Sequence, residues 1–194
     1  GYKPEECFEA IACGFTSVMF DGSKLPLSEN IDLTAGIVEK ARSAGVSVEG
    51  EVGYVGYADG PASAGTTPDE AARFDRDSGA DAMAISVGNV HLQTEKSDGI
   101  DFAALRAIEA VTTLPLVLHG GSGIPAAIRR KLASKSRVSK FNIGTELRMA
   151  FGQALRKSLA ANPDSFDRVT LLSPTIPAVR LVAAQVLTNI GPAR

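Results

Sequence analysis

Short runs rich in β-branched residues alternate along the whole chain with amphipathic segments of helical length. This alternation is typical of parallel strands joined by crossover helices. Parallel folds of this kind bind their ligands at the carboxyl ends of the strands. The expected strands are Thr16–Phe20, Val46–Val52, Ala82–Val87, Leu114–Leu118 and Val138–Ile143.

Seven segments between and around these strands have the spacing and the end signals of helices. The expected helices are Pro4–Cys13, Asn30–Ala44, Thr67–Gly79, Phe102–Val111, Pro125–Ser134, Thr145–Ala161 and Thr175–Gly191.

Five strands are fewer than the eight of a closed (β/α)8 barrel, which usually has about 250 residues. The chain also opens on a helix instead of a strand. Two architectures remain: an open five-stranded sheet, or the later part of a barrel whose first strands are absent. No linker divides the sequence, so residues 1–194 are expected to form one domain.

The overall composition excludes several classes of protein. The formal net charge of -2 argues against a nucleic-acid binder. No apolar run approaches the roughly 20 residues of a membrane helix, and no signal stretch opens the chain. Cys7 and Cys13 have no CxxC partner, so reduced thiols are expected. We therefore expect a soluble, cytoplasmic protein with no membrane partner.

A polar or glycine-rich group follows every expected strand. His91 and His119 are the chain's two histidines, and they lie about one β-α-β repeat apart, which predicts neighbouring strand ends and a shared metal ion. Two unrelated histidines with backbone partners are the alternative. Catalytic zinc usually has three protein ligands, and Glu51 and Asp21 are the strand-end carboxylates that could join. Glu49 lies on the same strand face as Glu51. It could point into the barrel with Glu51, or it could belong to a buried layer of hydrogen-bonded polar side chains.

Two glycine-containing turns precede helices near the last two strands. Turns of this kind offer backbone N–H groups to an anion, and barrels often hold a phosphate at this place. Ordinary tight turns are the alternative. The two segments are Gly120–Gly123 and Asn142–Thr145.

Four stretches together resemble the class II, metal-dependent fructose-bisphosphate aldolase family, including its tagatose-bisphosphate branch. They are GFTSVMFDGSKLPLSENI, VSVEGEVG, LPLVLHGGSGIP and FNIGTELRMAF, and the likeness runs from Gly1 to about Phe166. The resemblance implies a (β/α)8 TIM barrel of which about three N-terminal strands lie outside this chain. It further implies a cytoplasmic lyase of carbohydrate metabolism and glycolysis that forms a homodimer or homotetramer.

The implied reaction is cleavage of a ketose bisphosphate, fructose 1,6-bisphosphate first, to dihydroxyacetone phosphate and an aldehyde. Tagatose-bisphosphate or a related sugar phosphate is the alternative substrate. Two other interpretations stay open. One is a metal-free phosphate-binding barrel enzyme with acid/base histidines, and the other is a non-catalytic relative. No lysine is placed for a Schiff base.

The resemblance also assigns roles residue by residue. His91 and His119 would hold Zn²⁺, while Asp21 and Glu51 match positions of a displaced or second metal, divalent or monovalent. The first zinc histidine and the acid/base aspartate would precede Gly1, so no catalytic residue is expected within this chain. The substrate and its phosphate would meet Leu92, Gly120, Gly121, Ser122, Asn142, Ile143, Gly144 and Thr145.

Three positions depart from the family pattern and bear on the choice of substrate. Leu92 stands where the family has glycine, and Gly144 stands where many members have aspartate. The lysine expected to contact phosphate shortly after Leu92 is absent at that spacing, with Lys96 as a distant substitute.

Overall fold

A curved sheet of five parallel strands forms the centre of the molecule. The computed structural model describes residues 1–56, 62–92 and 99–191. The strand order is β1-β2-β3-β4-β5, so each strand pairs with the next one along the chain, as in a barrel wall. The strands are β1 (Ser17–Phe20), β2 (Ser47–Val52), β3 (Ala82–Ile85), β4 (Leu116–Leu118) and β5 (Val138–Phe141).

The five expected strands are confirmed, with shorter ends. Strand β4 begins at Leu116 instead of Leu114, because Pro115 has no backbone N–H to give to the ladder. The Pro115 carbonyl still accepts from the N–H of Met83 at 3.0 Å. Strand β3 ends at Ile85, and Val87 already belongs to the loop that leads to His91.

The expected helices are also present. Helix α2 begins at Leu27, directly after Pro26, three residues before the expected start. Two elements were not expected: the 3₁₀ turn η1, and α7, whose first N–H groups bind the Asp167 carboxylate. The helices are α1 (Pro4–Ala12), α2 (Leu27–Ser43), α3 (Pro68–Ser78), α4 (Phe102–Glu109), η1 (Gly121–Gly123), α5 (Ala126–Lys135), α6 (Thr145–Ala161), α7 (Arg168–Leu172) and α8 (Thr175–Ile190).

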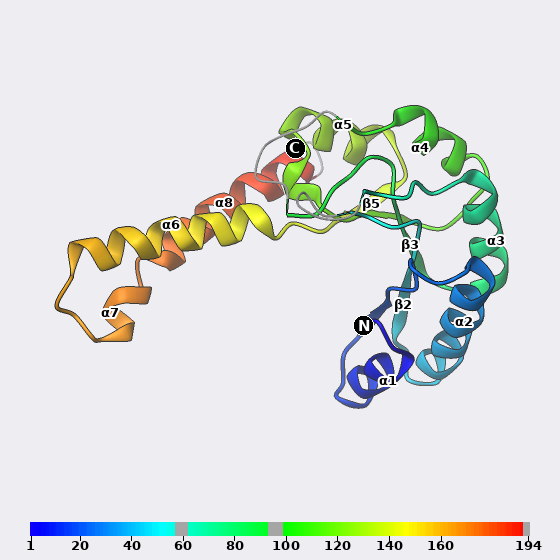
Figure 1. Cartoon of the computed structure of the whole chain (residues 1–194), viewed down its shortest axis with the longest axis horizontal. Helices are drawn as coiled ribbons and strands as arrows, with labels where there is room; N and C mark the ends of the chain where they lie inside the picture. The colour runs from blue at the N-terminus through cyan, green and yellow to red at the C-terminus, as the bar shows by residue number, and fades with distance from the viewer. Residues whose placement is uncertain (57–61, 93–98, 192–194) are drawn as a thin grey trace.

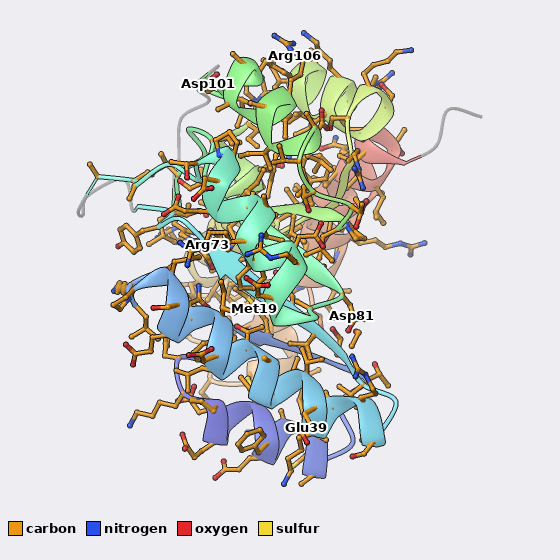
Figure 2. All side chains as sticks on the ribbon, turned by 90° about the vertical axis from the view of Figure 1, so that its right-hand side faces the viewer. Met19, Glu39, Arg73, Asp81, Asp101 and Arg106 are labelled. Atoms are coloured by element: carbon orange, nitrogen blue, oxygen red, sulfur yellow. The ribbon has the colours of Figure 1, made fainter. Side chains whose placement is uncertain are left out.

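Helices α1 to α5 lie along the outer side of the sheet (Figure 1). Figure 2 looks onto this layer, where Glu39 of α2 and Arg73 of α3 are exposed. Phe74, one residue after Arg73, is fully buried against strand β2. A Cβ atom at Gly50 would lie 2.4 Å from the Phe74 ring, so the missing side chain makes room for the helix. Glu49 and Glu51, on either side of Gly50, therefore face the other side of the sheet.

The last helices form an arm that extends away from the sheet. Helices α6 and α8 run side by side, and α7 lies at the far end (Figure 1). The segment Arg168–Ile190 is long and apolar enough to cross a membrane by length and composition alone, with a mean hydropathy of 1.4 over its most apolar 18 residues. The expectation that no segment approaches this length is wrong for these residues, because two adjoining helices combine with few charges. Only 11% of the apolar window is buried.

Candidate metal and phosphate site

The two histidines meet at the carboxyl ends of adjacent strands. His119 follows the last residue of β4, and His91 lies in the loop after β3. Their ring centroids are 5.7 Å apart and the ring planes are tilted by 44°. The neighbouring placement expected from their spacing is therefore what the structure has.

A buried asparagine ties the loop that carries His91 to the backbone of His119. The Asn89 amide Nδ2 donates to the carbonyls of Ile85 at 3.2 Å and His119 at 3.0 Å. Its Oδ1 accepts from the N–H of Val87 at 2.8 Å. Sequence reasoning missed Asn89 as a positioning residue, although its place at a strand end, two residues before a histidine, was a usable signal.

Gly120 brings the two loops into contact. Its φ of 65° is in the left-handed region, and a Cβ atom there would lie 2.1 Å from the Val90 carbonyl oxygen. Any side chain would push Val90, and with it His91, away from the end of β4. The first glycine after His119 thus has a role in holding the histidines together, in addition to any role in anion binding.

The His119 ring lies between two carboxylates of strand β2. Its Nε2 is 3.2 Å from Glu49 Oε1, and its Nδ1 is 3.1 Å from Glu51 Oε2. Burial opposes the charged ring, but the hydrogen bonds to the two glutamates outweigh burial and raise the pKa of His119 to about 9. The two carboxylates therefore favour the protonated form of the His119 ring when no metal is bound.

The pKa values of Glu49 and Glu51 are shifted in opposite directions. Burial opposes ionisation of Glu49, but hydrogen bonds from His119 and Lys140 outweigh it and lower the pKa of Glu49. Burial dominates for Glu51 and raises its pKa against the hydrogen bond from His119. The difference follows from Lys140, whose Nζ lies 2.6 Å from Glu49 Oε2.

His91 is the more accessible imidazole. Burial and the positive charge of His119 lower the pKa of His91. Its backbone N–H donates to the Gly56 carbonyl at 2.8 Å. A neutral imidazole is the form that binds metal ions, so His91 is prepared for that role.

All four proposed metal-binding residues line one cavity of about 270 Å³. Asp21 there accepts hydrogen bonds from the backbone and hydroxyl of Ser23 at 3.1 and 2.6 Å. Within the described ranges, no group of three or more His, Cys, Asp or Glu side chains is arranged to hold a metal ion. The donors suit zinc in kind, but they form an incomplete set. The cavity is lined by Gly1, Tyr2, Met19, Asp21, Lys24, Glu51, Tyr54, Val55, His91, His119 and Asn142.

A second cavity, of about 470 Å³, shares His91 and Asn142 with the first. It gathers all the proposed substrate residues except Gly121, and adds Arg148, which sequence reasoning missed. Arg148 lies in the first turn of α6. The sequence signal for it was a cationic residue three positions after Thr145, the expected start of this helix. The lining is His91, Leu92, Gly120, Ser122, Phe141, Asn142, Ile143, Gly144, Thr145 and Arg148.

Several N–H groups of the glycine-rich turn already have acceptors within the protein. Gly121 N–H donates to Asn142 at 3.1 Å, and Gly123 N–H donates to Gly120 at 3.0 Å. The Ser122 hydroxyl accepts from the N–H of Glu146 at 3.3 Å. The interpretation of this turn as an open cradle of N–H groups is therefore too simple, because the turn first serves to join β4 to the start of α6.

Two of the departures from the family pattern acquire a structural meaning. Leu92 has a φ of 55°, a conformation that glycine adopts without strain, and its side chain is 50% exposed at the larger cavity. A Cβ atom at Gly144 would lie 2.7 Å from Arg148 Nη1, so the guanidinium occupies space that a side chain at position 144 would take. The third departure concerns Lys96, which lies outside the described residues.

The model of the class-II fructose-bisphosphate aldolase family matches residues 1–193. The chain belongs to this family. A 6-phospho-5-dehydro-2-deoxy-D-gluconate aldolase of Bacillus licheniformis is 38% identical over 98% of the chain and 66% of its own length. A fructose-bisphosphate aldolase of Geobacillus stearothermophilus is 36% identical over 98% of the chain and 68% of its own length.

Among solved structures, the YdjI aldolase from Escherichia coli K12 superposes with a TM-score of 0.80 at 31% identity. The match covers 98% of this chain and 66% of that one. The chain thus spans about two thirds of the length of the class II aldolases that it matches. Its five parallel strands form part of a TIM barrel, which confirms the expected fold class, and the family as a whole is zinc-dependent.

Proposed function

We propose that the protein is a metal-dependent aldolase, a lyase that cleaves a phosphorylated ketose to dihydroxyacetone phosphate and an aldehyde. The observation that carries this proposal is the pair of adjoining cavities. One cavity holds His91 and His119 beside two carboxylates, and the other holds Arg148 beside the start of α6. A substrate spanning both would place its reacting carbonyl near the imidazoles and its phosphate near the guanidinium. Membership in the family supports the same reaction.

His91 and His119 are the residues that would hold zinc, with Glu51 and Asp21 available to a displaced or second cation. A bound zinc ion would polarise the ketose carbonyl as a Lewis acid. A protonated His119 must lose one of its two ring protons to become a ligand, and the Glu51 carboxylate lies 3.1 Å from its Nδ1. The acid/base aspartate and the first histidine would reach the cavity from just before Gly1, since Gly1 and Tyr2 line it.

The phosphate would lie at the N-terminal end of α6. Arg148 donates to Thr145 Oγ1 at 3.3 Å and has further N–H groups for an anion. Thr145 and Ser122 line the same cavity. Fixing one end of the substrate there orients the carbonyl for reaction at the other end.

Fructose 1,6-bisphosphate is the first substrate we propose, and a related ketose phosphate is the alternative. The names of the relatives divide between fructose-bisphosphate aldolase and 6-phospho-5-dehydro-2-deoxy-D-gluconate aldolase. Leu92 and the Gly144–Arg148 contact stand at the larger cavity, so these residues are where a different preference would arise.

A metal-free acid/base enzyme is the second candidate. The observation that favours it is the position of the His119 ring between the carboxylates of Glu49 and Glu51, which hold it without a metal ion. Chelation separates the two candidates, because acid/base chemistry by histidine would survive removal of metal.

The test is an assay of the intact protein on each ketose phosphate, with dihydroxyacetone phosphate detected by a coupled dehydrogenase. We expect cleavage that EDTA abolishes and zinc restores. Turnover that persists in EDTA would favour the metal-free enzyme. No turnover on fructose 1,6-bisphosphate, tagatose 1,6-bisphosphate or 6-phospho-5-dehydro-2-deoxy-D-gluconate would contradict the proposal.

We also propose a homodimer or homotetramer in the cytoplasm. The arm exposes large apolar side chains that a second subunit would cover, including Val169, Ile176 and Leu187. Both cysteines, Cys7 and Cys13, are free thiols, as in a reducing compartment. Neither nucleic acid nor a membrane is proposed as a partner.

A further inference from the structure

Glu49 is a buried carboxylate that lines neither of the two cavities, although it contacts His119 as closely as Glu51 does. Its side chain is 7% exposed, and both of its oxygens are engaged. Oε1 lies against His119 Nε2, and Oε2 accepts from Lys140 Nζ at 2.6 Å. The reaction described above uses neither Glu49 nor Lys140.

The two nitrogens of His119 face different surroundings. Nδ1 lies beside Glu51, which lines the smaller cavity together with His91 and Asp21. Nε2 lies beside Glu49, away from that cavity. A metal ion shared with His91 therefore has access to Nδ1, while Nε2 is left to donate a hydrogen bond.

We propose that Glu49 is a positioning residue that accepts the Nε2–H of His119 and thereby presents Nδ1 to the metal, and that Lys140 holds Glu49 in place. The inference rests on the metal site of the proposed function. Metal-binding histidines commonly donate their second ring N–H to a carboxylate, which fixes the tautomer and the ring orientation. The three residues come from strand β2, the end of β4 and strand β5, so they connect three strands of the sheet through one contact chain.

Lys140 is the last residue in this series of contacts and holds Glu49 from the other side. Its side chain is 50% exposed, so the ion pair with Glu49 adds little to folding by itself. Its contribution is directional, because it holds Oε2 and leaves Oε1 to His119. Arginine at this position would keep the ion pair, whereas methionine would keep the length of the side chain and lose the charge.

The first measurement is zinc affinity, by competition with a chromophoric chelator. We expect Glu49→Leu to weaken zinc binding by about 10- to 100-fold and Glu49→Gln by less, since losing the carboxylate that accepts a ligand histidine's N–H has effects of this size. Lys140→Met should weaken it a few-fold, and Lys140→Arg should restore it. Asp75→Asn and Lys131→Met are the matched controls. Asp75 accepts hydrogen bonds from Thr112 and Thr113, and Lys131 lies over the ring of Phe102. Their affinities should stay within twofold of the parent.

The second measurement reads the tautomer directly, by NMR of the chain labelled with ¹⁵N-histidine. This sequence contains two histidines, so four of the ring-nitrogen signals belong to His91 and His119. In the zinc-bound protein we expect His119 to carry its proton on Nε2 and the metal on Nδ1. In Lys140→Met, an exposed substitution that should fold normally, we expect the Nε2–H signal to broaden or shift. A purely structural role of Glu49 would lower stability without moving this signal.

Zinc bound to Nε2 of His119, or unchanged zinc affinity in a folded Glu49→Leu variant, would overturn the positioning role while leaving the proposed aldolase intact. Absence of zinc binding by the parent protein would instead contradict the proposed function, and this inference with it.

Discussion

His119 combines three roles that its position in the chain brings together. It directly follows the last residue of a buried strand, it is flanked by two glutamates of strand β2, and it contacts the loop of His91. The parallel register pairs Val117 with Ala84 and Ala84 with Glu51, so His119 lies two residues beyond the level of Glu51, and its ring contacts both carboxylates from there.

The metal-free protein should lose stability as the pH rises through the pKa of His119. The pKa is raised from 6.5 to about 9 in the folded state, so its contribution is complete below pH 6.5 and disappears above about pH 9. The upper limit of this contribution is about 3 kcal/mol at 1.36 kcal/mol per pKa unit. Urea unfolding in EDTA at pH 6, 8 and 10 measures it. Other groups also titrate at high pH, so the loss of stability is compared with that of His119→Gln. If stability falls equally with pH in the two proteins, the contribution of His119 is refuted.

At the scale of the elements, the outer helices decide which way strand β2 faces. Phe74 of α3 lies against Gly50, and this packing turns Glu49 and Glu51 inward. The period of two predicted a common face for the two glutamates. Which partners they would meet there, His119 and Lys140, depends on strand order and register, and neither is encoded in a local pattern.

Gly50→Ala should lower the free energy of unfolding by about 1–3 kcal/mol, because the new methyl group would overlap Phe74 and force the helix outward. Chemical denaturation provides the measurement. Gly36→Ala is the control: nothing lies within 4 Å of its Cβ position in the middle of α2, so it should stabilise the protein by about 0.5–1 kcal/mol. Equal effects of the two substitutions would contradict this packing role.

The sequence predicted the strand–helix alternation well, because periodicity and end signals are local. It also predicted that His91 and His119 would be neighbours, since one β-α-β repeat determines their separation. It could not predict that Arg148 would lie over Gly144, that Asn89 would join the two loops, or that the N–H of Gly121 would be bonded to Asn142. The contacts of Asn89 and Gly121 depend on how loops distant in sequence are placed in space, and the contact of Arg148 depends on the side-chain conformation at the start of α6.

At the scale of the whole molecule, the arm of α6, α7 and α8 extends away from the sheet (Figure 1), and large apolar side chains are exposed on it. Ile176 and Leu187 are 68% and 66% exposed and lie 11 residues apart, on one face of α8. Apolar surface of this kind marks an interaction site. A second subunit is the partner that we propose.

Replacing Ile176 and Leu187 together by glutamate should therefore reduce the molar mass in solution to that of one chain. Light scattering coupled to size-exclusion chromatography measures the mass. Gln185→Glu, an exposed change on the same helix, should leave the assembly intact. A parent protein that is already a single chain, or one that binds to lipid vesicles through this helix, would contradict the assembly that we propose.

The central claim is that His91 and His119 bind one metal ion for aldol cleavage. The most direct test is the zinc content of the intact protein purified without chelator, compared with His119→Ala and His91→Ala, together with the activity of each. The account predicts about one zinc per chain in the parent, and loss of both zinc and cleavage in each variant. Retention of zinc and activity in folded His119→Ala would contradict it.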